Sequence, residues 1–180
     1  MGDTFTVLAA RTGGFALTSY HALERAPELA AGFTHLVALD PPAGAAGAHV
    51  LAIGPGYSHL AWGAAELRFA QQMHELEYGL RTWLAALYRT VRSRTRVTGE
   101  ELERLLRGDA TQPRPARIGG RLIRVLAELE LVSLDRNLPA LALAGTAHTA
   151  LERSAAYRAY TRRLEDGRRY LSSENQLVPG

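Results

Sequence analysis

The chain of 180 residues contains no cysteine and no lysine, and all 21 of its basic residues are arginine. Without cysteine the chain can form no disulfide, no thiolate zinc site and no cysteine nucleophile. Without lysine it can have no phosphate-loop lysine, no Schiff base and no lysine general base. These two absences exclude several common kinds of active site.

Signals for membrane insertion and export are also missing from the sequence. No apolar run approaches the roughly 20 residues of a membrane span. The start "MGDTFTVLAA" lacks the basic region that precedes the apolar part of a signal peptide. Because the chain also lacks cysteine, we expect a cytoplasmic protein with no membrane partner.

Charge is divided unevenly along a chain of globular composition, which is 47% hydrophobic and 22% charged. Residues 1–80 hold 3 arginines and 7 acidic residues, a net charge of −4. Residues 81–180 hold 18 arginines and 11 acidic residues, a net charge of +7. This asymmetry indicates two parts, of which the second either faces something acidic or carries an arginine-rich solvated surface.

The first part has the pattern of a small α/β unit. Two short β-type runs, "TFTVLAA" and "FALTSY", precede a helical stretch, "HALERAPELAAG", for which Gly32 is the expected end. "THLVALD" and "AHVLAIG" (48–54) are apolar enough to be strands buried on both faces of a parallel sheet. Asp40 ends the first of them, where nucleotide hydrolases often hold a metal. That chemistry also needs a phosphate-loop lysine, so Asp40 is interpreted as a strand end before the turn "PP".

The second part has the pattern of helices followed by a hairpin. Gly79 is expected to separate two helices, the second with an apolar stripe from Leu80 to Val91. "VTGEELERLLRG" predicts a helix with a capping box and a glycine stop, and "ARIGGRLIRVLAELELV" predicts another. "LVSLD", "RN" and "LPALALAG" predict a β-hairpin whose second strand Pro139 places at a sheet edge. Three helices and a hairpin in this order are typical of a winged helix.

These patterns together predict an α/β fold. A small, mostly parallel sheet unit is followed by a winged-helix-like helical part and a terminal helix, "TALERSAAYRAYTRRLEDGRRYL". The expected domains are residues 1–78, a degenerate nucleotide-fold-like unit, and residues 79–180, although both can pack as one domain.

Histidines and serines give no recognisable catalytic motif. In "HELEY", Tyr78 stands where the second histidine of a "HExxH" zinc motif would be, and no "GxSxG" elbow is present. We therefore expect no catalytic residue, no bound metal and no cofactor. A metal site assembled from scattered histidines and aspartates stays open as an alternative.

Arginines at helical spacing are the candidate binding residues. On the second helix of the winged-helix-like part they form an expected exposed stripe: Arg117, Arg121 and Arg124. Further arginines lie on the terminal helix and at the end of an earlier helix: Arg158, Arg162, Arg169, Arg92 and Arg94. Arginine suits both DNA and acidic peptides, so spacing leaves both partners open. Cations at a helix end also favour the helix dipole.

Five segments, in this order, resemble the C-terminal region of the bacterial RecJ family: "FTHLVALDPP", "HLAWGAAELRFA", "LRTWLAALYRTVR", "TGEELERLL" and "LERSAAYRAYTRRLEDGRRYL". RecJ proteins are 5′-to-3′ exonucleases specific for single-stranded DNA, with a catalytic core that holds divalent metals through motifs such as "DHH". This chain has no "DHH" and only two aspartates before residue 109. The resemblance therefore implies an accessory domain that binds partners, notably the acidic, hydrophobic-ended tail of single-stranded-DNA-binding protein.

Three hypotheses follow from the sequence. The first is a non-catalytic interaction domain of a RecJ-like DNA-repair exonuclease, which binds an acidic partner tail, with DNA left open as a further partner. The second is a stand-alone winged-helix regulator that binds duplex DNA with steep salt dependence. The third is an enzyme with a scattered-ligand metal site.

Overall fold

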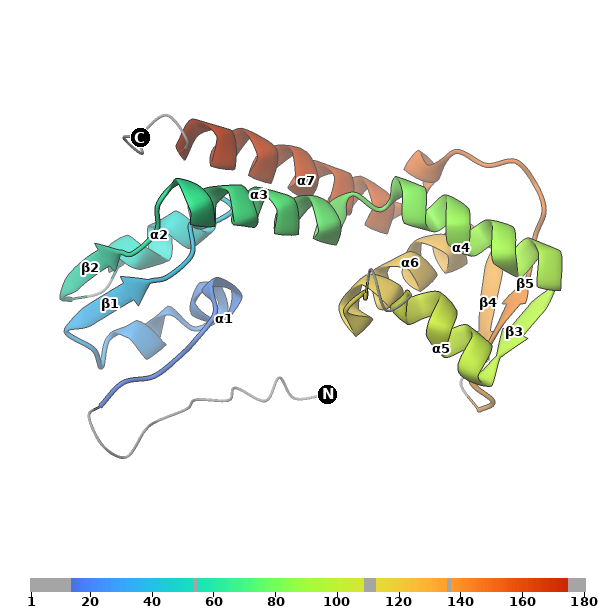
Figure 1. Cartoon of the computed structure of the whole chain (residues 1–180), viewed down its shortest axis with the longest axis horizontal. Coiled ribbons are helices and arrows are strands. Elements are labelled where there is room, and N and C mark those ends of the chain that lie inside the picture. The colour runs from blue at the N-terminus through green and yellow to red at the C-terminus, as the bar shows by residue number, and fades with distance from the viewer. Residues whose placement is uncertain (1–13, 54, 109–112, 136, 175–180) are drawn as a thin grey trace. The chain divides into compact units, whose positions relative to one another are not determined.

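A computed structural model describes residues 14–53, 55–108, 113–135 and 137–174, and the chain is a mixed α/β protein, which confirms the predicted class (Figure 1). It forms two compact units: unit 1 comprises residues 1–74 and 166–180, and unit 2 comprises Glu75–Glu165. The expected division was a single boundary after residue 78, whereas the two units also share the terminal helix. None of the helices in the described residues has the length and apolar character needed to cross a bilayer.

Unit 1 contains a two-stranded parallel sheet and short helices. Its elements are α1 (Tyr20–Arg25), the 3-10 helix η1 (Pro27–Ala30), β1 (His35–Ala38), α2 (Ala45–Ile53), β2 (Tyr57–Leu60), most of α3 (Ala64–Tyr78) and the end of α7 (Ala155–Glu174). β1 pairs with β2 in parallel, as expected for this part, but β2 lies at Tyr57–Leu60, where no strand was predicted. Leu23, Ala30 and Val50 form a small core with Tyr20 and Leu36 packed against it.

Three local predictions for unit 1 are wrong. "FALTSY" is not a strand, because the Ser19 hydroxyl accepts the N–H of Ala22 and starts α1 at Tyr20. Residues 48–53 of the strand predicted at 48–54 are helical, because the alanine-rich run before Ile53 forms α2. "THLVALD" gives only the four residues of β1, and Val37 is 58% exposed, so the strand is not buried on both faces. The expected strand "TFTVLAA" lies outside the described residues.

Unit 2 contains helices and a three-stranded antiparallel sheet. Its elements are the end of α3, α4 (Arg81–Arg94), β3 (Arg96–Thr98), α5 (Gly99–Arg107), α6 (Ala116–Glu128), β4 (Val132–Asp135), β5 (Ala140–Leu143), the 3-10 helix η2 (Leu151–Arg153) and the start of α7. The strand order is β3-β5-β4, with the strands beside α4, α5 and α6 (Figure 1). β4 and β5 pair as the predicted hairpin. β5 is central, so the edge predicted from Pro139 is wrong. Pro139 precedes the first paired residue and removes no ladder donor.

The core of unit 2 follows the predicted apolar stripes. Leu80, Leu84, Leu87 and Val91 of the first stripe are at most 1% exposed, which confirms that stripe. They pack in one cluster with buried side chains of α6 and the sheet: Ile118, Leu122, Val125, Leu126, Val132 and Leu141. Burying a side chain of this size contributes about 1.5–3 kcal/mol. This packing fixes the orientation of α6, and with it the side of the helix that carries arginines.

The helix boundaries of unit 2 agree with the glycines but not with the predicted capping box. α3 ends and α4 begins around Gly79, as predicted. α5 ends at Arg107, and its C-cap Gly108 has a φ of 77° that favours glycine. Thr98 precedes α5 but makes no side-chain capping bond, and the Glu101 side chain pairs with Arg94 at 3.4 Å, so neither half of the predicted box is formed.

Candidate binding site

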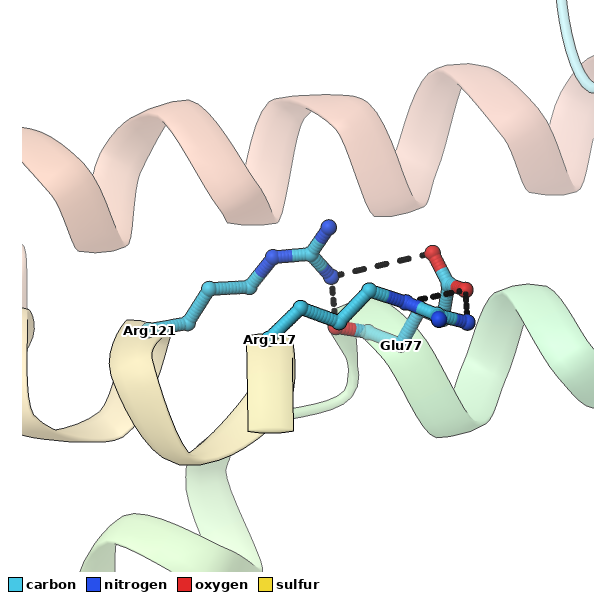
Figure 2. A network of polar contacts seen from close by, with 3 residues as sticks. All are labelled: Glu77, Arg117 and Arg121. Carbon is cyan, nitrogen blue, oxygen red and sulfur yellow. Dashed lines mark hydrogen bonds and ion pairs between the residues drawn. The ribbon is translucent and has the colours of Figure 1, made fainter. Parts of the chain in front are cut away.

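Two arginines of α6 meet one glutamate at the end of α3. Figure 2 shows Arg117 and Arg121 pointing toward Glu77. Arg117 donates through Nε to the Glu77 carboxylate at 3.0 Å and forms an ion pair with it through Nη2. Arg121 donates through Nη1 to the backbone carbonyl of Glu77 at 2.6 Å and lies 3.8 Å from its carboxylate. Because the arginines are four positions apart on one helix, both can reach the same group.

Two tyrosines surround the Arg121 guanidinium. It lies 4.4 Å from the centre of the Tyr78 ring and 5.5 Å from the centre of the Tyr160 ring. Arg163 lies 5.6 Å from the same Tyr78 ring. We call this group the Arg–Tyr cluster; its members are Glu77, Tyr78, Arg117, Arg121, Tyr160 and Arg163. All six belong to unit 2.

Arg121 has a structural role within the cluster. The Glu77 carbonyl belongs to the last turn of α3, where helix carbonyls have no donor from the next turn. Arg121 supplies that donor, and its side chain is only 17% exposed. The expected exposed stripe is therefore corrected: Arg121 is packed, whereas Arg117 and Arg124 are 53% and 66% exposed.

Arg124 borders the cluster and pairs with the last residue of α6. Its Nε donates to Glu128 Oε1 at 3.1 Å. The Glu128 carboxylate raises the pKa of Arg124, and the phenol of Tyr160 adds to the effect. Arg124 therefore lies beside Tyr160 while it remains exposed, and it extends the basic surface that begins at Arg117.

Glu128 is itself held by the start of α7. Its Oε2 accepts the N–H of Ala156 at 2.9 Å and the hydroxyl of Ser154 at 2.7 Å, while the Ser154 oxygen accepts the N–H of Tyr157 at 3.0 Å. The Ala156 bond, followed by the Ser154 bond, holds the pKa of Glu128 at about 2, against an opposing effect of burial. A side chain from α6 thus satisfies the N–H of Ala156 at the start of α7 and holds the Ser154 hydroxyl that satisfies the N–H of Tyr157.

The predicted arginine row on the terminal helix is divided between the units. Arg158 and Arg162 belong to unit 2 and Arg169 to unit 1, so the structure does not define them as one surface. Arg158 donates to the carbonyls of Glu152 and Arg153, at the end of η2, at 2.6 and 3.2 Å. Arg162 is exposed, and Arg169 is paired with Asp166.

Arg92 and Arg94 lie in the last turn of α4, where cations stabilise the helix end. Both are exposed. Arg94 pairs with Glu101 at 3.4 Å, whereas Arg92 forms no ion pair in the part of the chain that the structure describes. Neither joins the Arg–Tyr cluster, so these two residues remain a separate basic patch.

Asp40 is exposed, and its backbone is fixed by α1. The Tyr20 hydroxyl donates to the Asp40 carbonyl at 2.6 Å. Burial, followed by the charge of Asp40 and then Tyr170, raises the pKa of Tyr20 to about 12, so the phenol stays protonated and continues to donate. Asp40 therefore lies just after β1, where a hydrogen bond from α1 holds the backbone in place.

Among the described residues, no three histidine or acidic side chains lie close enough together to hold one metal ion. Two histidines do lie together: Nδ1 of His35 is 2.9 Å from Nε2 of His59. His74 is buried in α3.

An open hollow of about 350 Å³ also lies in unit 1, and its lining is mainly apolar: Pro42, Ala48, Leu51, Ala52, Ser58, Leu60, Trp62 and Tyr170.

Four members of the Arg–Tyr cluster are not among the binding residues that the sequence predicts: Glu77, Tyr78, Tyr160 and Arg163. They come from α3 and α7, which are far from α6 in the sequence. The spacing of arginines along α6 predicts which of them lie near one another, but it does not predict which carboxylate they contact. Only the tertiary packing of three helices brings this site together.

Comparisons with known proteins yield no relative. No protein-family model, no curated protein and no solved structure matches the chain.

Proposed function

We propose that the chain is a non-catalytic interaction domain of a RecJ-like DNA-repair exonuclease. In this proposal unit 2 binds an acidic partner segment, in the first place the hydrophobic-ended tail of single-stranded-DNA-binding protein. The observation that carries it is the meeting of Arg117 and Arg121 on the Glu77 carboxylate beside two tyrosine rings. This arrangement already accommodates a carboxylate, so it can accept one from another chain.

We further propose that α4 to β5 is a winged helix. The order of its helices and strands, and the sheet order β3-β5-β4, support this assignment. In that arrangement α6 is the helix that would enter a DNA groove, and the loop between β4 and β5 is the wing.

The contacts of α6 favour a peptide over a duplex. A groove-reading helix needs several side chains free to reach base edges. Arg121 is packed on Tyr78, while Arg117 and Arg124 are engaged with Glu77 and Glu128. Arg117 and Arg124 remain more than half exposed, so an incoming carboxylate can replace these internal partners one at a time.

Charge supports the same conclusion. Unit 2 holds 16 arginines and 11 acidic residues, a net charge of +5, whereas unit 1 holds 5 arginines and 7 acidic residues, a net charge of −2. An acidic segment is therefore steered to unit 2, and its association slows as salt screens the field.

Fluorescence anisotropy with a labelled acidic, hydrophobic-ended peptide tests the proposal on the whole chain. The test variant is Arg117→Gln with Arg124→Gln. The matched control is Arg104→Gln with Arg107→Gln on α5, which removes the same charge from exposed positions. We expect the test variant to lose about tenfold in affinity, as for two exposed charge contacts, and the control to lose much less. Equal losses in both variants contradict the residue assignment.

A labelled DNA duplex in the same assay examines the alternative. The second candidate is a stand-alone regulator that binds duplex DNA. The order of helices and strands in unit 2 and the sheet order β3-β5-β4 favour it, because both are those expected of a winged helix. Binding of the duplex but not the peptide, with an affinity that falls steeply with salt, supports the regulator and contradicts the interaction domain.

A further inference from the structure

The two strands of unit 1 present one face with two histidines. β1 and β2 pair in register, with His35 beside Tyr57 and Val37 beside His59. Alternate residues of a strand point to opposite faces, so these four side chains share a face while Leu36 points to the other. Leu36 packs on the core formed with α1 and α2. The histidine face is the open one, since Val37 and Tyr57 are 58% and 69% exposed.

On this face the two imidazoles are held close together. His35 Nδ1 and His59 Nε2 are 2.9 Å apart, and the ring centres are 5.2 Å apart. The Tyr57 ring stacks on His35 with a centre separation of 5.7 Å and an angle of 21° between planes. The strand register brings the two rings together, and the stacking on Tyr57 supports the ring of His35.

The separation of the two nitrogens fits neighbouring ligands of one metal ion. With metal–nitrogen bonds of 2.0–2.1 Å, two ligands at a right angle lie about 2.9 Å apart, and two at a tetrahedral angle lie about 3.3 Å apart. Right angles occur in the square-planar and tetragonal geometries of Cu²⁺ and Ni²⁺. The observed 2.9 Å equals the first value.

We propose that His35 and His59 form a binding site for a Cu²⁺- or Ni²⁺-type ion on the open face of the sheet. Each nitrogen gives its lone pair to the metal, so each neutral ring carries its proton on the other nitrogen, and the bond between the imidazoles is replaced. Because the described residues supply only these two ligands, water takes the other positions, and those positions accept a further ligand from solution.

This site is independent of the proposed acidic-partner function. Its ligands belong to unit 1, whereas the Arg–Tyr cluster belongs to unit 2. Loss of metal binding therefore leaves the peptide proposal intact, and the reverse also holds.

Titration of the tag-free whole chain with Cu²⁺, followed by electron paramagnetic resonance, tests the site. We expect one tightly bound Cu²⁺ with a spectrum showing coordination by two imidazole nitrogens. The test variant is His35→Gln with His59→Gln. The control is His21→Gln with His49→Gln, which removes two other exposed histidines. The test variant is expected to lose affinity by about tenfold or more, since even the loss of an outer-shell partner of a metal ligand costs that much.

Thermal unfolding gives a second readout. Ni²⁺ is expected to raise the melting temperature of the wild type and of the control but not of the test variant, because a ligand that binds only the folded state stabilises it. Circular dichroism of each metal-free variant checks that it is folded. Equal Cu²⁺ affinity and equal Ni²⁺ stabilisation in the test variant and the wild type overturn the proposal.

Discussion

The guanidinium group of Arg121 lies 4.4 Å from the centre of the Tyr78 ring while its Nη1 donates to the carbonyl of Glu77 at 2.6 Å. One side chain thus satisfies a helix end and packs on an aromatic ring. This separates two roles among the arginines of α6. Arg121 stabilises the cluster, and in our proposal the more exposed Arg117 and Arg124 bind the partner.

Arg121→Met should destabilise unit 2. The change keeps much of the side-chain volume but removes a charged hydrogen bond and a cation–π contact, together about 2–3 kcal/mol. Urea denaturation measures the free energy of unfolding. Arg104→Met is the control, because Arg104 is exposed on α5 and should change stability by less than about 0.5 kcal/mol. Equal effects of the two substitutions would show that Arg121 is not a structural residue.

Glu77→Gln should strengthen binding of the acidic peptide. The substitution removes the internal carboxylate that competes for Arg117, and it preserves the backbone carbonyl that accepts from Arg121. We expect the dissociation constant to fall by a few-fold, as for one partly exposed ion pair. Peptide titration by calorimetry measures it, and weaker binding by the Glu77→Gln variant would argue against this competition.

Glu128 should make the free energy of unfolding depend on pH in the acidic range. Its pKa is about 2, below the usual value, so its contribution is present above about pH 4.5 and is lost as the pH falls toward 2. The free energy of unfolding of the wild type should therefore exceed that of Glu128→Gln at pH 6, and the difference should shrink by pH 3. Ser154→Ala, which removes the other cap of α7, should cost about 1 kcal/mol. A difference that does not change with pH would contradict the assigned role of Glu128.

Gly167→Ala should destabilise unit 1. A Cβ at Gly167 would lie 2.1 Å from the Nε2 of His74, which is buried, so the ring or the helix must move. Overpacking of this kind costs about 1–3 kcal/mol. Gly120→Ala on α6 is the matched control, since a Cβ there meets open space and should stabilise the helix by about 0.5–1 kcal/mol. Thermal melting of both variants compares them directly, and equal shifts would contradict the packing of Gly167 on His74.

The second half of the fold is more predictable from sequence than the first. Leu80, Leu84, Leu87 and Val91 recur at helical spacing, and that spacing is enough to predict that they share one buried face. In unit 1 the apolar run ending at Ile53 suits a strand or a helix equally, and its alanines decide for the helix. Short apolar runs carry no period long enough to separate the two.

The candidate site is predictable only in part. The spacing of Arg117, Arg121 and Arg124 correctly places them on α6. It cannot show that Arg121 turns inward, because that depends on Glu77 and Tyr78 at the end of a helix distant in the sequence. His35 and His59 are likewise 24 positions apart and meet only through strand register.

The most direct test of the central claim follows the arginine side-chain Nε–Hε signals of the ¹⁵N-labelled chain during titration with the acidic peptide. The account predicts that the signals of Arg117 and Arg124 shift, because their internal carboxylates are replaced, while those of Arg104 and Arg107 stay in place. Shifts confined to Arg104 and Arg107, or no shifts at saturating peptide, would contradict it.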